Sequence, residues 1–174
     1  LAAATLAALG SALLTGGAQA AAFYVKTDQD AGRDSLRQAI LEPNTTAGAD
    51  TISFAIPGIG PQTIELLSPL PPLVDPVTID GASQGPPGDH LIVLDGAQLP
   101  PHSIGLELRG EGSWVHHLVL HRFGTVYPDV KTAIWLSGTG RQVVSACRLG
   151  TDSEGLVEIG NNVGIVVDSD ANWI

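Results

Sequence analysis

Sulfur-containing and aromatic residues are scarce in this chain of 174 residues. With one cysteine, Cys147, no internal disulfide can form, so stability must come from packing and hydrogen bonds. We expect Cys147 to be a buried apolar residue. Methionine is absent, even at position 1, and we therefore expect the sequence to be part of a longer chain that continues beyond Ile174.

Basic residues are also few. Eight Lys and Arg against 18 Asp and Glu give a formal net charge of −10. An acidic surface repels nucleic acid, anionic membranes and polyanionic glycans unless cations bridge the two. Other surface glycans and proteins are the partners that this charge allows. Glycine and proline, with 21 and 12 residues, are abundant and predict frequent turns.

Charged side chains are absent from Leu1 to Val25, where a short leucine-containing run precedes Ala18, Gln19 and Ala20. Residues 1–20 are typical of a secretory signal peptide, cleaved after Ala20 or, as a second choice, after Ala22. A transmembrane helix is the alternative, because the uncharged run is long enough to span a bilayer. Glycines and the lack of a stop-transfer pattern favour the signal peptide. We therefore expect an extracellular or cell-surface protein that does not insert into the membrane after cleavage.

Residues 21–48 predict a cap with one strand and one short helix. Phe23 to Val25 favour a strand, and a helix over residues 35–42 begins at Ser35. Ser35 and Gln38 form a capping-box pattern, in which each side chain satisfies a backbone amide of the first turn. Pro43 ends the helix. Its apolar face consists of Leu36, Ala39 and Ile40.

Short β-rich runs separated by Gly, Pro, Asn and Asp fill residues 49–174. The expected strands are Thr51–Ile56, Thr63–Leu67, Val77–Ile79, Leu91–Leu94, Gly105–Leu108, Leu118–Leu120, Ala133–Leu136, Val143–Leu149 and Val163–Val167. Asp80 with Gly81, and Asp95 with Gly96, are interpreted as turns that end two of these runs.

The apolar pattern of these runs repeats at a nearly constant interval. Leu106, Leu108 and the following Gly110 recur as Ile134, Leu136 and Gly138, and a third copy begins at Ile165. Val115, Leu118 and Leu120 recur as Val144, Cys147 and Leu149, with one residue added in the intervening turn. Such repeats predict stacked coils, and hence an all-β parallel β-helix whose first end is covered by the short helix. An antiparallel sandwich is the alternative, although it does not require this repeat.

Several motifs resemble secreted bacterial β-helix proteins with a CSLREA-type N-terminal cap. The resemblance rests on Thr27–Asp28, Asp34–Ile40, Gly48–Phe54, Ser68–Pro71, Pro76–Gly81, Leu149–Asp152 and Gly160–Ile165. The cysteine that begins the family motif is absent, with Arg33 and Asp34 in its place. The resemblance implies a right-handed parallel β-helix of the pectate-lyase-like superfamily, in a large exported protein.

Two functions follow from this expectation. The first is a secreted or cell-surface module with a structural or adhesive role. The alternative is the N-terminal part of a polysaccharide lyase or glycoside hydrolase, because the resemblance implies outer-face carboxylates, often with Ca²⁺. The repeat places Arg109, Ser137 and Asp168 in one outer ladder, which is not a carboxylate cluster, so the catalytic residues are unknown and the first function is favoured.

Two groups of residues are candidate metal ligands, although no cofactor is required by either function. His117 and His121 flank an expected strand and are candidates for zinc. Asp28, Asp30 and Asp34 resemble a calcium loop, although the distal glutamate of such a loop is not in place. Aspartates before a helix are also expected without a metal, because they favour the helix dipole. Trp114, Trp135 and Trp173 are candidates for a sugar-binding platform.

Overall fold

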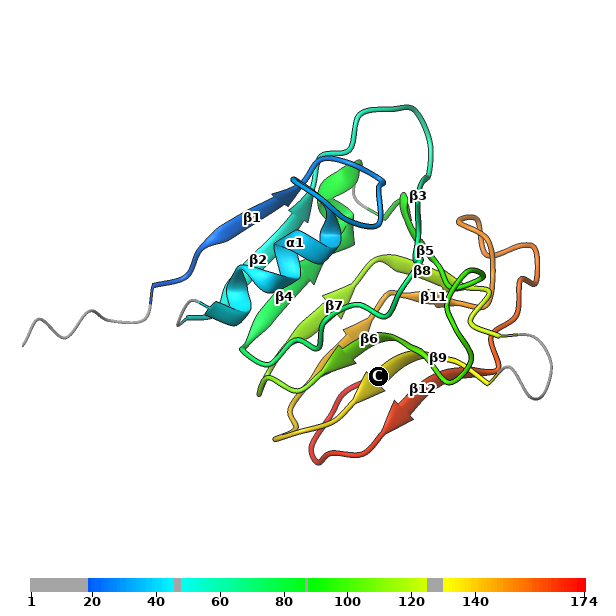
Figure 1. The fold of residues 1–174 in the computed structure, drawn as a ribbon. Coiled ribbons are helices and arrows are strands. Elements are labelled where there is room, and N and C mark those ends of the chain that lie inside the picture. The colour runs from blue at the N-terminus through cyan, green and yellow to red at the C-terminus, as the bar shows by residue number, and fades with distance from the viewer. Residues whose placement is uncertain (1–18, 46–47, 87, 125–129) are drawn as a thin grey trace, which may run out of the picture.

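The structure is a computed structural model that describes residues 19–45, 48–86, 88–124 and 130–174. Its short strands wind into a β-solenoid, and every strand pair within the three sheets is parallel (Figure 1). The largest sheet has five strands, one from each coil. The predicted parallel β-helix is therefore confirmed, and the antiparallel sandwich is wrong.

Three sheets form the sides of the solenoid in the described part of the chain. Sheet A contains β1 (Ala22–Val25), β2 (Asp50–Phe54), β4 (Val77–Asp80), β7 (Trp114–His116) and β10 (Val143–Ser145). Sheet B contains β3 (Gln62–Glu65), β5 (Ile92–Asp95), β8 (Leu118–His121) and β11 (Arg148–Leu149). Sheet C contains β6 (Ile104–Leu108), β9 (Thr132–Leu136) and β12 (Val163–Val167).

Inward-facing side chains form continuous rows along the solenoid. In sheet C, Leu106 aligns with Ile134 and Ile134 with Ile165, as the repeat predicts. Val115 and Val144 are aligned in the same way in sheet A. Each buried aliphatic side chain stabilises the fold by about 1.5–3 kcal/mol, so these rows hold the coils together.

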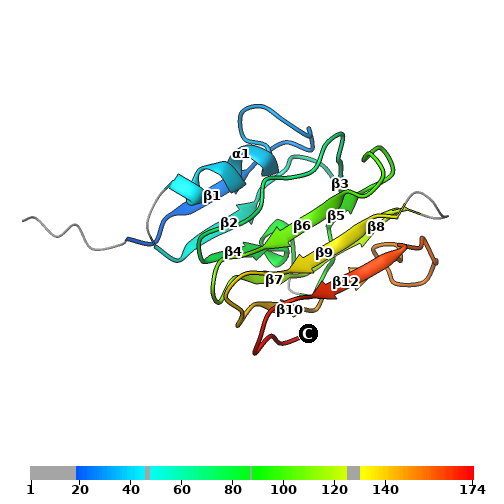
Figure 2. The ribbon, with the colours of Figure 1, turned by 60° about the horizontal axis from the view of Figure 1, so that its bottom comes forward.

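A short helix, α1 (Leu36–Leu41), covers the β1–β2 end of the solenoid, while the C-terminal residues lie at the opposite end (Figure 2). Ser35 is the N-cap, and its side chain accepts a hydrogen bond from the backbone amide of Gln38. The second half of the predicted capping box is wrong. Instead of returning to the Ser35 amide, the Gln38 side chain donates to Glu42 at 3.1 Å.

Three details differ from the predicted strands. Trp114–His116 forms a strand of its own, and the run Val143–Leu149 is divided into β10 and β11 by Ala146, whose φ is +48°. The repeat predicts Val167 inside, but it is 50% exposed. It aligns with the buried Leu136, but β12 is the last strand of its sheet, so no further coil of the described chain covers it.

Left-handed backbone conformations recur at two corners. Gly112, Arg141 and Ala171 have φ of +72°, +59° and +57°, and the strands beside them are paired so that these three positions stack. At the corner between sheets A and B, His117 and Ala146 are also left-handed, with φ of +56° and +48°, and their positions stack in the same way. Because a left-handed residue is unfavourable unless it is glycine, the stacked coils must impose this geometry.

Candidate functional site

The outer face of sheet B carries a row of three ionisable side chains. The strand register aligns Glu65 with Asp95 and Asp95 with His121. Neighbouring strands are separated by about 4.8 Å, so each side chain in such a row can reach the next. The row therefore combines two carboxylates and an imidazole.

Asp95 lies at the centre of this row and is only 1% exposed. Arg122 donates to it from Nε at 2.9 Å and also from Nη2, which makes the pair bidentate. The backbone amide of Ala97 donates a third hydrogen bond to Oδ1 at 2.9 Å. Hydrogen bonding to Asp95 raises the pKa of Arg122 above its usual value. The Asp95 carboxylate is thus surrounded by hydrogen-bond donors of the protein.

His121 lies beside this ion pair, with Nε2 at 3.7 Å from Oδ2 of Asp95. Both ring nitrogens are buried, and neither has a hydrogen-bond partner among the described residues. Burial lowers the pKa of His121, although the carboxylate of Asp95 acts in the opposite direction. A neutral imidazole beside a carboxylate is a combination that acid–base catalysis uses. Here, however, the nitrogens do not reach the solvent.

The segment after β11 is bound to the end of this row. The Asn161 side chain accepts from the amide of Phe123 at 3.0 Å and donates to the carbonyl of Leu120 at 2.9 Å. The amide of Arg122 donates to the carbonyl of Ile159 at 3.5 Å. The Asp95–Arg122 pair thus joins two neighbouring coils, and the contacts of Ile159 and Asn161 attach the next coil at the same place.

A second polar cluster lies at the corner between β7 and β8. The Nδ1 atoms of His116 and His117 face each other at 3.0 Å, and the rings of His90 and His117 are 5.4 Å apart. His116 Nε2 is 3.5 Å from Oδ1 of Asp80. Burial lowers the pKa of His116, the Asp80 carboxylate opposes this, and the neighbouring His117 adds to the lowering. One of the two facing nitrogens must then donate and the other accept.

The two zinc candidates have different neighbours in the structure. His117 lies against His116 and His90, whereas His121 lies beside Asp95. Among the residues that the structure describes, no group of three or more His, Cys, Asp or Glu side chains is arranged to hold a metal ion. The zinc site stays a prediction.

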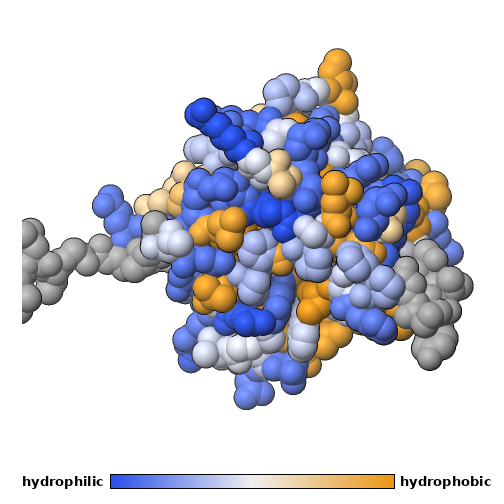
Figure 3. All heavy atoms as spheres, viewed as in Figure 1, coloured by the Kyte–Doolittle hydropathy of each residue, from blue (hydrophilic) through white to orange (hydrophobic). Residues whose placement is uncertain are grey.

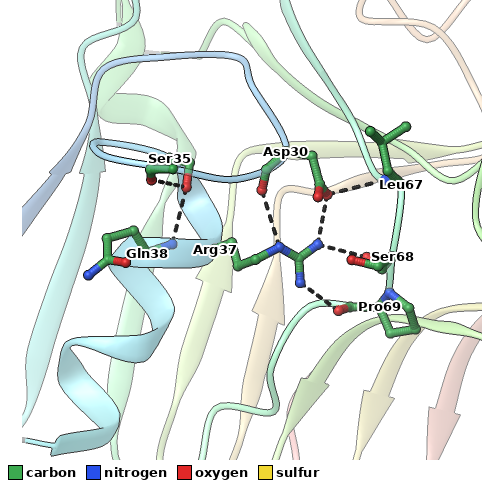
Figure 4. Close-up of polar contacts among 8 residues, drawn as sticks. Asp30, Ser35, Arg37, Gln38, Leu67, Ser68 and Pro69 are labelled. Carbon is green, nitrogen blue, oxygen red and sulfur yellow. Dashed lines mark hydrogen bonds and ion pairs between the residues drawn. The ribbon is translucent and has the colours of Figure 1, made fainter.

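The calcium candidate Asp30 is held by hydrogen bonds from other residues of the chain (Figure 4). Its Oδ1 accepts from Nη2 of Arg37 at 2.7 Å and from the amide of Leu67 at 3.2 Å. Arg37 also donates to the carbonyls of Ser68 and Pro69 at 2.8 and 2.7 Å. The Asp30–Arg37 pair therefore fastens α1 and the preceding loop to the segment after β3.

The other two loop aspartates are more loosely held. Asp28 accepts from the side chain of Gln29 at 2.9 Å, and Asp34 lies 3.7 Å from the exposed Arg33. Asp28 also lines an open hollow of about 290 Å³, together with Asp30 and Glu65. The calcium site stays a prediction.

The predicted outer ladder is aligned as expected. The register of sheet C extends to place Arg109 beside Ser137, and Ser137 beside Asp168. Glu107 contacts two residues at this end of the sheet. It accepts from Arg109 Nε at 2.7 Å and from the Ser137 hydroxyl at 3.2 Å.

Sequence reasoning missed the Asp95, His121 and Arg122 cluster. The sequence pattern marks Asp95 only as a turn residue, and the predicted register places no carboxylate beside a basic residue. The repeat begins at Leu106, so it does not align β5 with β8. The signal was available, since Leu94-Asp95 and Leu120-His121 share the same position at strand ends.

Comparison with protein-family models, curated proteins and solved structures finds no match to this chain. No helix in the described part of the chain has the length and apolar character needed to cross a membrane. The predicted signal peptide falls almost entirely on residues 1–18, which lie outside the described residues.

Proposed function

We propose that this protein is a secreted or cell-surface β-helix module with a structural or adhesive role. The observation that carries the proposal is the outer face of sheet A, where side chains from five consecutive coils stand in register. A rigid, evenly spaced surface of this kind suits repeated weak contacts with an extended partner.

The polar groups of sheet B support a structural role. Asp95 is enclosed and bound to Arg122, and the ring nitrogens of His121 are shielded from solvent. Figure 3 shows polar and apolar side chains interspersed over the face in view, as is common on a soluble surface.

Export is part of the proposal. The uncharged stretch from Leu1 to Val25 and the triplet Ala18 to Ala20 support a signal peptide. The cap motifs around Ser35 support the relationship to secreted bacterial β-helix proteins. Mass determination of secreted material tests this: the mature chain should begin at Ala21, whereas an intact N-terminus in the membrane fraction would indicate an anchor.

The adhesive role is tested by binding the purified protein to whole bacterial cells and to surfaces coated with polysaccharide or protein. We expect saturable binding to at least one surface, without release of soluble products. Failure to bind any of them would leave a purely structural role, which single-molecule extension would detect as resistance to unfolding.

A carbohydrate-active enzyme is the second candidate, because the carboxylates of Asp28, Asp30 and Glu65 line one open hollow at the surface. Incubation with neutral and acidic polysaccharides, with and without Ca²⁺, tests it. New reducing ends or unsaturated products that disappear in the Glu65→Gln variant would favour the enzyme over the adhesive module.

A further inference from the structure

A straight row of outward-facing residues crosses sheet A along the solenoid axis. The pairing aligns Thr51 with Thr78, Thr78 with Trp114, and Trp114 with Val143. An isolated parallel bridge extends the row from Val143 to Trp173. The tryptophans are 41% and 75% exposed, so this row presents two aromatic side chains to the solvent.

The first of these side chains is fixed in place. Trp114 Nε1 donates to the hydroxyl of Ser145 at 2.8 Å. Its ring also packs against the ring of His116, with 4.3 Å between the centroids. A side chain that is already ordered loses little conformational entropy when a ligand covers it. Trp114 is thus suited to act as a binding platform.

The spacing of the two tryptophans points to a particular ligand. They lie two coils apart, and neighbouring strands are about 4.8 Å apart, so the two positions are separated by about 10 Å along the axis. That separation is close to the length of one disaccharide unit in an extended β-1,4-linked polysaccharide. Two sugar rings of such a chain, separated by one intervening ring, would therefore lie over Trp114 and Trp173.

The polar residues in the row and next to it favour a neutral polysaccharide chain. Thr51 and Thr78 offer hydroxyl groups that hydrogen-bond to sugars, while Asp80 lies on the neighbouring outer row next to His116. The whole protein carries a formal net charge of −10. A polysaccharide with a carboxylate on each ring would be repelled by this surface.

We propose that the row of Thr51, Thr78, Trp114, Val143 and Trp173 binds an extended neutral polysaccharide, with its sugar rings stacked on Trp114 and Trp173. This inference rests on the proposed adhesive function, and it identifies the class of partner and the face that meets it.

Affinity electrophoresis in gels containing soluble β-1,4-glucan, xylan or polygalacturonate tests the proposal, together with calorimetry on the matching oligosaccharides. We expect the protein to bind a neutral polymer, and Trp114→Ala and Trp173→Ala each to weaken binding about tenfold or more, as loss of an aromatic anchor does. Trp135→Ala is the matched control, because Trp135 lies on β9 of sheet C. Urea unfolding of each variant checks that the fold is retained.

Three outcomes would overturn the inference. The first is that the Trp114→Ala and Trp173→Ala variants bind as strongly as the unmodified protein. The second is that the Trp135→Ala variant loses binding, and the third is a preference for polygalacturonate over the neutral polymers. If the protein instead adheres only to protein-coated surfaces, the inference fails while the adhesive function stands. If it adheres to nothing, the adhesive function fails as well.

Discussion

Arg37 provides a direct test of how the cap is attached to the solenoid. Its guanidinium group makes four hydrogen bonds, two to Asp30 and one each to the carbonyls of Ser68 and Pro69. The Arg37 and Asp30 side chains are only 17% and 10% exposed. Replacing Arg37 by Met would leave the Asp30 carboxylate largely buried without its counter-charge.

The expected cost follows from these contacts. Breaking a buried ion pair by removing one partner destabilises a protein by about 3–5 kcal/mol. Water reaches part of this pair, so for Arg37→Met we expect the lower end, about 3 kcal/mol, and a melting temperature lowered by roughly 6–12 °C. Arg37→Lys keeps the charge but cannot reach all the acceptors at once, and should lose about half as much. The control Arg33→Met removes a side chain that is 95% exposed and should change stability very little.

Urea unfolding, followed by circular dichroism, measures the global effect. Because each coil contacts only its neighbours, the cap can also open locally, and hydrogen exchange of residues 23–42 measures that opening. Equal stability and equal exchange in the Arg37→Met and Arg33→Met variants would refute the view that Arg37 attaches the cap.

Three further predictions concern the coils. A side chain on Gly105 would overlap the Phe123 ring and the carbonyl of Ala133, so Gly105→Ala should lower the urea midpoint of unfolding. The control Gly160→Ala adds its methyl group in open space and should leave the midpoint unchanged, and equal midpoints for the two variants would contradict this packing. Burial raises the pKa of Cys147 to about 11, so a thiol reagent at pH 7 should label Cys147 slowly in the native protein and rapidly in urea. Rapid labelling of the native protein would show that the last coils open. Because burial lowers the pKa of His121 below the unfolded value of about 6.5, the unfolded state binds more protons, and the stability of the protein should fall as the pH drops below this value. Between pH 7.5 and pH 5, the free energy of unfolding in urea should therefore change less in His121→Gln than in the unmodified protein.

The fold could be predicted because its rule is periodic. Apolar residues that recur at a nearly constant interval must form inner rows if each repeat is one coil, and the alignment of Leu106 with Ile134 confirmed that step. The helix could also be predicted from the sequence, since Ser35 and Pro43 mark its two ends. What failed was the detail of single hydrogen bonds, such as the partner of the Gln38 side chain, which depends on nearby competitors that no sequence pattern fixes.

The polar clusters could not be found from spacing alone, because they combine positions whose separations differ from coil to coil. The stretch of chain from Glu65 to Asp95 is longer than the stretch from Asp95 to His121, yet all three residues stand in one row. The variation lies in the turns, while the strands keep their pairing. Outer-face residues show no hydrophobic pattern that reveals such shifts, so their neighbours emerge only when each coil is aligned through its buried side chains. Trp114 and Trp173 are likewise distant in the sequence, and they fall on one row because the strand pairing aligns each of them with Val143, although the two coils between them differ slightly in length.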